Sequence, residues 1–531
     1  MSDGARISDL ISVARAARRR GLDLRQIEGA VVAHDFHVYG ARAPDDFSVD
    51  LNDIYDVVVS MAAREPLLPP GQRLRDVFEL GSEVEIAQRV MRESEPLAPQ
   101  WVGVPGAGVW YYEPERGVWR ELDPGDIYQR VALYDGVMHV AGIDPKTGDP
   151  KLRPMKISHK IMENAYKIVE KLRADDEFFD GERKGIAFAD TFVEIRDNGA
   201  IITDPHGPEH RARVAMPYRW HSGAEPPRFL QTLREIWADR DDVEGHVRVL
   251  REWMGAMMAG LAPRYARGII LSSRAGSTGK STIQDIVCGI MPEDAVASIA
   301  PHTMGHEYSR AALYGARLNS VAELPFSEIG DSEAVKAIIT GDYVRGRRIY
   351  SEGIRFRPTA GHLFSCNRPP GTRDHSGGFW RRWIVLECTR VFGAGGDAPE
   401  VKGLAQQIVA AEAGEIASWA LEGACDLIRR GYYEIPVDAE RALEEWRHAA
   451  DPVKAYLDER CRPIAPDARI TLWTQASVLY SDFRAWCERN GHRTMTSTSF
   501  ADRVQGLGIE RTRTRSGSEY AVEILPALRA V

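Results

Sequence analysis

The segment Gly268-Ile269-Ile270-Leu271 is followed, after a short connection, by Gly276-Ser277-Thr278-Gly279-Lys280-Ser281-Thr282, and this stretch decides the fold. The apolar run predicts a buried strand. The residues behind it predict a helix, because Ile283, Ile286, Val287 and Ile290 recur at helical spacing. A strand, a glycine-containing turn and a helix in this order are typical of a phosphate-binding loop, in which backbone N–H groups at the helix N-terminus surround the anion.

The residue types within this loop predict ATP and Mg²⁺ as cofactors. Lys280 is expected to reach the β- and γ-phosphates and the Ser281 hydroxyl to coordinate Mg²⁺. The expected nucleotide-binding residues are Gly276, Ser277, Thr278, Gly279, Lys280, Ser281 and Thr282. Arg274 replaces the first glycine of the eight-residue motif, so the loop requires Arg274 at an ordinary backbone angle.

Length and composition exclude several classes of protein. A chain of 531 residues is too long for one hydrophobic core and should form several domains. The net charge of −9 argues against a uniformly basic coat, so any DNA contact must come from local clusters. The chain has no long apolar run and no signal-like N-terminus, so no membrane association is expected. Its six cysteines are scattered without a Cys-x-x-Cys pair, which favours the cytoplasm and argues against structural zinc or disulfides.

Sequence patterns predict an α/β protein with four regions. Residues 1–66 form a helical module, 67–225 an α+β accessory region, 226–440 the α/β nucleotide module and 441–531 a compact C-terminal domain. Within the accessory region, residues 108–112 and 117–119 predict a hairpin. Its aromatic side chains could stack on bases, but an aromatic cross-strand pair in a core is the favoured interpretation.

Two polar side chains follow predicted strands downstream of the loop. Glu323 ends the predicted strand from Leu318 to Glu323, where an acid can hold Mg²⁺ or orient the attacking water. The alternative is that Glu323 is only a solvated surface residue, as a single acid at a strand end usually is. Asn367 follows the strand at 363–366, where its amide can sense the γ-phosphate or position water.

Basic residues form two further candidate sites. A turn at Glu352-Gly353 predicts a β-hairpin, and basic side chains interleaved with an aromatic ring suit a single DNA strand. The expected DNA-binding residues of this hairpin are Arg345, Arg347, Arg348, Tyr350 and Arg355. Arg381 and Arg382 are candidates for an arginine finger that reaches the nucleotide of a neighbouring subunit. Each cluster alone could equally be solvated surface charge.

The order and spacing of these segments together resemble the superfamily-3 helicases, most closely the phage and plasmid primase-helicases of the poxvirus type. The resemblance covers about residues 80 to 525. The matching motifs are Gly279-Lys280-Ser281, the strand from Leu318 to Glu323, the segment from Thr340 to Arg357, Asn367-Arg368-Pro369, and the segment from Ser376 to Arg382. Two departures are Arg274 and Ala322, which stands where many relatives carry a second acid.

This resemblance implies an AAA+-like P-loop core that hydrolyses ATP as a hexameric ring. Lys280, Ser281, Glu323 and Asn367 would come from one subunit, and Arg381 or Arg382 from the next. Single-stranded and forked DNA are the implied partners, in the cytoplasm of a bacterial host. Residues 5–65 look like the helical module that follows the catalytic domain of primase-polymerases. No primase catalytic domain precedes them, so priming is not predicted, and a separate primase remains open as a partner.

The C-terminal region predicts a winged helix, as the family tail implies. Helices are expected at 453–457, 476–490 and 499–507, followed by two strands around a turn at 511–520. Arg511, Arg513 and Arg515 alternate, so they should share one side of a strand and bind duplex or forked DNA together with Arg503 of the preceding helix. The alternative is a polar hairpin that only keeps the tail soluble. A truncation near residue 445 is expected to spare the ATPase.

These features favour an ATP-dependent DNA helicase that acts in replication of a phage, prophage or plasmid. One alternative is a nucleotide-gated initiator that binds and melts an origin but unwinds little. A second alternative, a small-molecule P-loop kinase, is disfavoured by the arginine hairpin, the strand that ends in Asn367 and the length of the chain.

Overall fold

The computed structural model describes residues 78, 80–94, 101–143, 150–325, 329–348, 353–372, 374–464, 473–491, 494–514 and 517–525. The chain divides into two compact units. The first comprises Met1–Gly103, Gly108–Trp110 and Glu121–Ala174, and the second comprises Val104–Ala107, Tyr111–Arg120 and Asp175–Val531. The predicted helical module at 1–66 lies outside the described residues. The predicted accessory region at 67–225 contributes to both units.

Among the described residues of the first unit are three mutually packed helices and a β-hairpin. Asp123 caps α5 by accepting a hydrogen bond from the Gly125 N–H, and Ser158 caps α6 in the same way through Ile161. The elements are α4 (Glu83–Ser94), α5 (Pro124–Ala132), β4 (Met138–Ile143), β5 (Pro150–Pro154) and α6 (His159–Leu172). Strands β4 and β5 pair antiparallel, with a register shift between Val140 and Gly142.

The predicted aromatic hairpin is present as β2 (Gly108–Glu113) and β3 (Val118–Glu121), in a sheet of order β1-β2-β3 whose first strand is β1 (Trp101–Val104). Its residues are divided between the two units. Trp110, Tyr112 and Trp119 are all buried. The core interpretation of these aromatic side chains is therefore confirmed, because a buried ring cannot stack on a base.

The second unit contains a parallel five-stranded sheet of order β10-β11-β14-β9-β15. The strands are β9 (Gly268–Ser272), β10 (Val296–Ala297), β11 (Leu318–Val321), β14 (Gly361–Cys366) and β15 (Trp383–Glu387). Strand β14 lies between β9 and β11, although it follows both in the sequence. The predicted α/β class is confirmed, and its sheet is parallel. The carboxyl ends of β9, β11 and β14 share one edge, which is where ligands bind in open α/β sheets.

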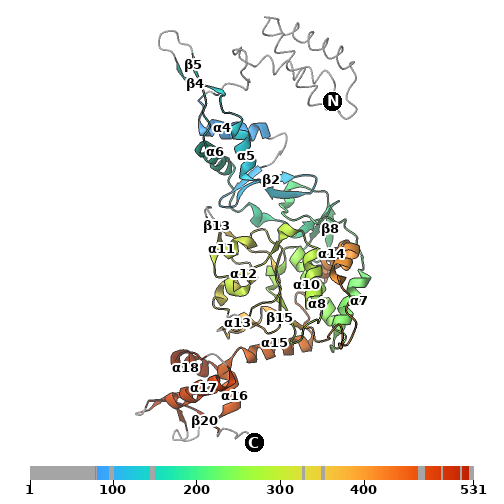
Figure 1. Ribbon diagram of the computed structural model, residues 1–531, viewed down its shortest axis with the longest axis vertical. Coiled ribbons are helices and arrows are strands. Elements are labelled where there is room, and N and C mark those ends of the chain that lie inside the picture. Colours follow the sequence, from blue (N-terminus) through green and yellow to red (C-terminus); the bar gives the residue numbers. More distant parts are fainter. Residues whose placement is uncertain are drawn as a thin grey trace. The chain divides into compact units, whose positions relative to one another are not determined.

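Helices cover this sheet and share its hydrophobic core. Helix α8 packs along α14, and α10 also packs on α14 (Figure 1). Trp253, Met254 and Met257 of α8 are fully buried in this core. The helices are α7 (Pro227–Ile236), α8 (Val243–Met258), α9 (Ala262–Tyr265), α10 (Lys280–Gly289), α11 (Glu307–Arg310), α12 (Ser332–Thr340), α13 (Gly377–Trp380) and α14 (Leu404–Arg430).

Smaller elements of the second unit accompany the parallel sheet. An antiparallel sheet of order β6-β7-β8 is formed by β6 (Gly185–Ala187), β7 (Phe192–Ile195) and β8 (Ile201–Asp204). The 3₁₀ helix η1 (Phe178–Gly181) precedes it. A hairpin is present in the predicted segment, as the antiparallel pair β12 (Val344–Arg347) and β13 (Gly353–Phe356). Its connecting residues, 349–352, lie outside the described residues. The predicted turn position is wrong at Gly353, because this residue begins β13 and pairs with Arg347.

The C-terminal part of the second unit has its own core, which includes Tyr456, Phe483 and Phe500. Helix α17 spans the predicted 476–490, and the other two predicted helices are also present. The elements are α15 (Val437–Ala449), α16 (Pro452–Arg460), β16 (Cys461–Pro463), β17 (Thr474–Gln475), α17 (Ala476–Asn490), α18 (Ser497–Gly506), β18 (Arg511–Thr514), β19 (Gly517–Tyr520) and β20 (Val522–Ile524). Helix α15 runs without a break across the predicted boundary at 440/441.

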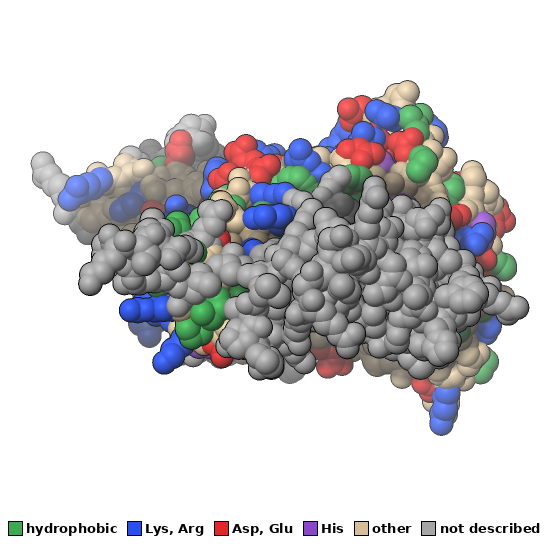
Figure 2. All heavy atoms as spheres, turned by 90° about the horizontal axis from the view of Figure 1, so that it is seen from above, with side chains coloured by type: hydrophobic (Ala, Val, Ile, Leu, Met, Phe, Trp, Pro, Cys, Tyr) green, Lys and Arg blue, Asp and Glu red, His purple; other side chains and the backbone are tan. Residues whose placement is uncertain are grey.

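The described residues also show how surface charge is distributed, the state of the cysteines and the length of the apolar helices. On the face seen in Figure 2, acidic and basic side chains of the described residues lie interspersed rather than forming one basic coat. All six cysteines lie in described segments and are free thiols. In the described ranges, no helix is both long enough and apolar enough to cross a membrane.

Candidate functional site

The loop between β9 and α10 has the backbone geometry of a sharp turn into a helix. Ser277 has a φ of 53° and Gly279 a φ of 84°, both in the left-handed region. A Cβ at Gly279 would also lie 2.6 Å from Ile236 Cδ1, so glycine is required there for space as well. Arg274 has a negative φ, and its side chain is 91% exposed and 3.9 Å from Glu445. Arg274 therefore leaves the turn undisturbed.

The same loop presents a row of free backbone donors. From Gly276 to Thr282, the backbone N–H groups donate no hydrogen bond within the described part of the chain. The Thr278 side chain is 2% exposed, and its hydroxyl also lacks a hydrogen-bond partner there. Consecutive unpaired N–H groups at a helix N-terminus, with the helix dipole behind them, form a site that fits an anion such as a phosphate group.

Lys280 begins α10 and its ammonium lies over this loop. Its Nζ is 3.5 Å from the Ala275 carbonyl oxygen and 3.3 Å from Asn367 Oδ1. Burial lowers the pKa of Lys280, although neighbouring groups that include Glu323 raise it. The Cys366 thiol nearby is neutral at physiological pH, because burial raises its pKa to about 12. Lys280 is thus a partly desolvated cation, a state that a bound phosphate would stabilise.

Glu323 lies just past the end of β11 in a left-handed conformation with a φ of 57°. Two hydrogen bonds hold this turn: the Glu323 N–H donates to Ser365 Oγ at 3.1 Å, and the Leu324 N–H donates to the Ser365 carbonyl at 2.7 Å. Its carboxylate is exposed at the edge of the sheet. A strained non-glycine backbone that is fixed by its neighbours is typical of functional positions.

Asn367 follows β14, which pairs with β9 on one side and β11 on the other. This strand order places its amide between the segment that carries Lys280 and the segment that carries Glu323. Ser365, two residues earlier, fixes the Glu323 turn and was not singled out from the sequence. No local signal could have identified it, because its role depends on the pairing of β14 with β11.

The two candidate arginine fingers have different environments. Arg381 is exposed. Arg382 is 8% exposed, and its guanidinium donates to the Gly378 carbonyl of the same turn. Burial, followed by the charge of Arg381, lowers the pKa of Arg382. The Arg381 side chain is therefore open to solvent, whereas the Arg382 guanidinium is held by the turn that carries it.

The β12–β13 hairpin has one basic face. Arg345 and Arg355 are cross-strand partners, and both are exposed, as is Arg347. The alternate residues Val344, Ile354 and Phe356 are buried. Arg348 follows β12 and is half-buried, and Tyr350 lies outside the described residues.

The C-terminal basic strip is partly as expected. Arg511 and Arg513 are exposed on the same side of β18, and Arg515 lies outside the described residues. Arg511 donates to Ser518 Oγ at 2.8 Å. Arg503 does not join this strip: its Nε is 2.9 Å from Asp451 Oδ2, a carboxylate that also caps α16 and is 1% exposed. Arg503 therefore does not extend the basic strip of β18, because it neutralises a buried acid.

Ser281 in the first turn of α10 and Glu323 just past β11 are the residues that could hold Mg²⁺, and both are exposed. The described residues contain no cluster of three or more His, Cys, Asp or Glu side chains able to hold a metal alone. Such a site suits Mg²⁺, which is usually bound through one or two protein ligands together with substrate phosphates.

Comparison with known proteins gives one family and a set of solved structures. The model of a family of unknown function, DUF5906, matches residues 271–382, a range that contains every predicted residue of the nucleotide site. An apo structure of the NrS-1 C-terminal region is 10% identical with a TM-score of 0.41, over 83% of this chain and 99% of that chain. The A-form apo structure of this region is 13% identical with a TM-score of 0.33, over 58% of this chain and 77% of that chain.

Proposed function

We propose that this chain is an ATP-dependent DNA helicase that acts in the replication of a phage, prophage or plasmid. One observation carries the proposal: Lys280, Glu323 and Asn367 follow three adjacent parallel strands and meet at one edge of the sheet, beside a loop of unpaired N–H groups. A cation, an acid and an amide around an anion site are the parts that phosphoryl transfer to water requires.

Each residue of the site then has a separate role. The N–H groups from Gly276 to Thr282 and the Lys280 ammonium bind the phosphates. Ser281 and Glu323 hold Mg²⁺, and the Glu323 carboxylate orients the attacking water. The Asn367 amide, which contacts Lys280 in the free protein, is positioned to sense the γ-phosphate. When bound, ATP supplies the phosphoryl group and Mg²⁺ neutralises developing charge.

The exposed Arg381 supports an assembly in which one subunit completes the site of the next. An arginine that stabilises the transition state in trans requires a head-to-tail contact, and a closed ring lets every subunit provide both halves. We assign this role to Arg381 rather than Arg382, because the Arg382 guanidinium is bound to Gly378 within its own subunit. A hexamer is the ring that the family resemblance implies.

The basic face of β12–β13 supports binding of a single DNA strand. Like charges directly opposite each other on a hairpin are destabilising, so the exposed Arg345–Arg355 pair is better explained by an anionic partner. Hydrolysis would move this hairpin along the strand. Exposed Arg511 and Arg513 would contact the fork.

An origin-melting initiator is the second candidate, favoured by Ala322, which is exposed beside Glu323 where many relatives carry an acid. ATP turnover with and without single-stranded DNA tests the proposed function, and forked and origin duplexes separate the two candidates. A helicase should show DNA-stimulated turnover and unwind long forks. An initiator would open only a short origin duplex. No ATP turnover under any condition would contradict both candidates.

A further inference from the structure

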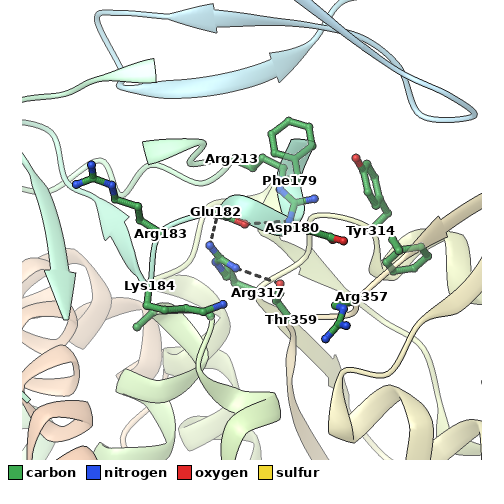
Figure 3. A pocket seen from close by; sticks show the side chains of 13 residues that line it. Phe179, Asp180, Glu182, Arg183, Lys184, Arg213, Tyr314, Arg317, Arg357 and Thr359 are labelled. Atoms are coloured by element: carbon green, nitrogen blue, oxygen red, sulfur yellow. Dashed lines mark hydrogen bonds and ion pairs between the residues drawn. The ribbon is translucent and has the colours of Figure 1, made fainter. Parts of the chain in front are cut away.

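A polar cavity in the second unit is lined by none of the residues of the nucleotide loop. It has a volume of about 60 Å³, several times the roughly 10–15 Å³ that one water molecule needs. It is lined by residues of η1, by the segments just before β6 and just after α8, and by the end of β13 together with the residues that follow it. Figure 3 shows Lys184, Arg213, Arg317 and Arg357 converging around it with Glu182 between them.

At its base, two arginines share one carboxylate. Arg317 Nη2 donates to Glu182 Oε1 at 2.5 Å, and Arg213 Nη2 donates to Glu182 Oε2 at 3.0 Å. The side chains of Arg317, Glu182 and Arg213 are 3%, 6% and 7% exposed. The Nε groups of both arginines have no partner in the described part of the chain. This buried group therefore holds two positive charges and one negative charge, together with two unsatisfied donors.

The remaining charges around the cavity add to this excess. Among the described residues, the Lys184 ammonium makes no hydrogen bond or ion pair, and Lys184 is exposed. Although Lys184 as a residue is exposed, partial desolvation of its ammonium lowers its pKa. The nearby arginines lower this pKa further, and Glu182 raises it. Asp180 is the only other acid that lines the cavity within the described ranges, and it accepts a hydrogen bond from the Tyr343 hydroxyl at 2.5 Å. Uncompensated buried charge is costly, so an anion should bind here favourably.

The cavity lies where the basic face of the hairpin ends. Exposed and buried residues alternate along β13 and into the residue that follows it. Arg357 therefore lies on the same exposed side as Arg355. The guanidinium carbons of Arg355 and Arg357 lie 3.7 and 4.3 Å from the centroid of the Tyr343 ring. Because Tyr343 also bonds to Asp180 of η1, the end of the arginine face is tied directly to the cavity rim.

We infer that this cavity binds a single phosphate group, held by Lys184, Arg213 and Arg317. Its volume suits a compact tetrahedral anion, and guanidinium groups match phosphate oxygens in geometry. The source is either inorganic phosphate or a backbone phosphate of the strand on the hairpin. The second source rests on the proposed function, whereas the first is independent of it.

The test uses the full-length protein and the exposed residue Lys184, whose replacement should not unfold it. Lys402→Gln is the matched control, since Lys402 is also exposed and lies outside the cavity. The thermal unfolding midpoint is measured in inorganic phosphate and in chloride at equal ionic strength. Both variants also carry Lys280→Ala, so that the nucleotide loop does not contribute. In parallel, without Lys280→Ala, the salt dependence of binding to single-stranded DNA is measured.

Two results would support the cavity and identify the phosphate. If the ligand is free inorganic phosphate, it raises the thermal unfolding midpoint of the Lys402→Gln protein and not that of the Lys184→Gln protein. If it belongs to DNA, Lys184→Gln reduces the salt slope by about 0.7–1, the value of one phosphate contact. Equal behaviour of Lys184→Gln and Lys402→Gln in both measurements would overturn the inference. If the wild-type chain does not bind single-stranded DNA, that result counts against the proposed function. The unfolding measurement in inorganic phosphate then decides by itself whether the cavity binds phosphate.

Discussion

The Lys280 ammonium lies 3.3 Å from the Asn367 side-chain oxygen, although the two residues are 87 positions apart in the sequence. The contact exists because β14 pairs directly with β9, so the residue after β14 faces the loop after β9. It links the phosphate-binding end of the site to the amide that we propose senses the γ-phosphate. In the free protein, the Asn367 amide oxygen accepts one of the hydrogen bonds that the Lys280 ammonium would otherwise donate to a phosphate.

Replacing Glu323 should separate nucleotide binding from hydrolysis. Glu323→Gln keeps the shape of the side chain but cannot polarise water as a carboxylate does, so turnover should fall by about 10²-fold or more. Binding of a fluorescent ATP analogue should persist. Glu333→Gln is the control, because Glu333 is an exposed acid of α12 that pairs with Lys336. Wild-type turnover by Glu323→Gln would show that another acid orients the water.

The two adjacent arginines should behave differently when replaced. Arg381→Ala should lower ATP turnover by about 10³–10⁵-fold, the usual value of an arginine finger, with an unchanged unfolding temperature. Arg382→Ala should instead lower the unfolding temperature, because its buried guanidinium bonds to the Gly378 carbonyl. Mixing Arg381→Ala with Lys280→Ala should restore part of the activity, since a mixed interface can pair an intact loop with an intact finger. Absence of any recovery in folded, oligomeric mixtures would argue against action in trans.

Removing charge from the hairpin face should weaken DNA binding in a salt-dependent way. The double variant Arg345→Ala/Arg347→Ala should reduce the salt slope for single-stranded DNA by about 0.7 for each lost phosphate contact. ATP turnover without DNA should be unchanged, because neither residue lies in the nucleotide loop. Lys402→Ala serves as the control for loss of a surface charge. A salt slope equal to that of the wild type would exclude the hairpin as the DNA contact.

The buried Glu182 predicts a specific dependence of stability on pH. Burial raises the pKa of Glu182, but Arg317 and Arg213 outweigh this effect and hold it below the usual value of 4.5. A carboxyl whose pKa is lower in the folded protein than in the unfolded chain stabilises the fold when the pH is above its pKa in the unfolded chain. This stabilisation is lost as the pH falls through the pKa of the carboxyl in the folded protein. Glu182→Gln should cost about 3–5 kcal/mol at neutral pH, because two buried arginines lose their counter-ion.

Chemical denaturation at several pH values measures this effect. Glu209→Gln is the control, since the Glu209 side chain is 60% exposed. The difference in the free energy of unfolding between the wild type and Glu182→Gln should shrink below about pH 4.5, the ordinary pKa of a glutamate carboxyl. A difference that stays constant down to acid pH would contradict the assigned charge state.

The sequence predicts a helix, strand or turn well where the residues of that segment alone carry the pattern. Helix α17 follows from the spacing of its buried residues, and the turn before α10 follows from Gly279 and Lys280. Contacts between distant segments were not predictable in this way. The Glu182–Arg317 pair spans 135 positions, and the role of Ser365 depends on strand order. Arg503 was assigned to DNA because its helix alone gives no sign of the buried Asp451.

Helix α15 changes the expected effect of truncation. Trp446 is 3% exposed, its ring lies 5.1 Å from that of Trp380, and its Nε1 donates to the Pro370 carbonyl at 2.9 Å. Trp380 directly precedes Arg381. A cut after residue 445 removes Trp446 and should destabilise the nucleotide module by about 3–5 kcal/mol, as for other buried tryptophans.

A cut after residue 450 keeps all of α15 and should spare ATP turnover while weakening binding to forks. Comparison of the two truncated proteins by thermal unfolding and ATP turnover tests this boundary. Equal unfolding temperatures for the two would show that Trp446 does not contribute to the stability of the nucleotide module.

Strand displacement on a forked DNA duplex, followed by fluorescence with ATP present, tests the central claim most directly. The wild-type chain should separate the strands only with ATP and Mg²⁺, and Lys280→Ala should not separate them, because the ammonium that binds the β- and γ-phosphates is missing. Strand separation by Lys280→Ala at the wild-type rate, or none by the wild type on any fork, would contradict the account.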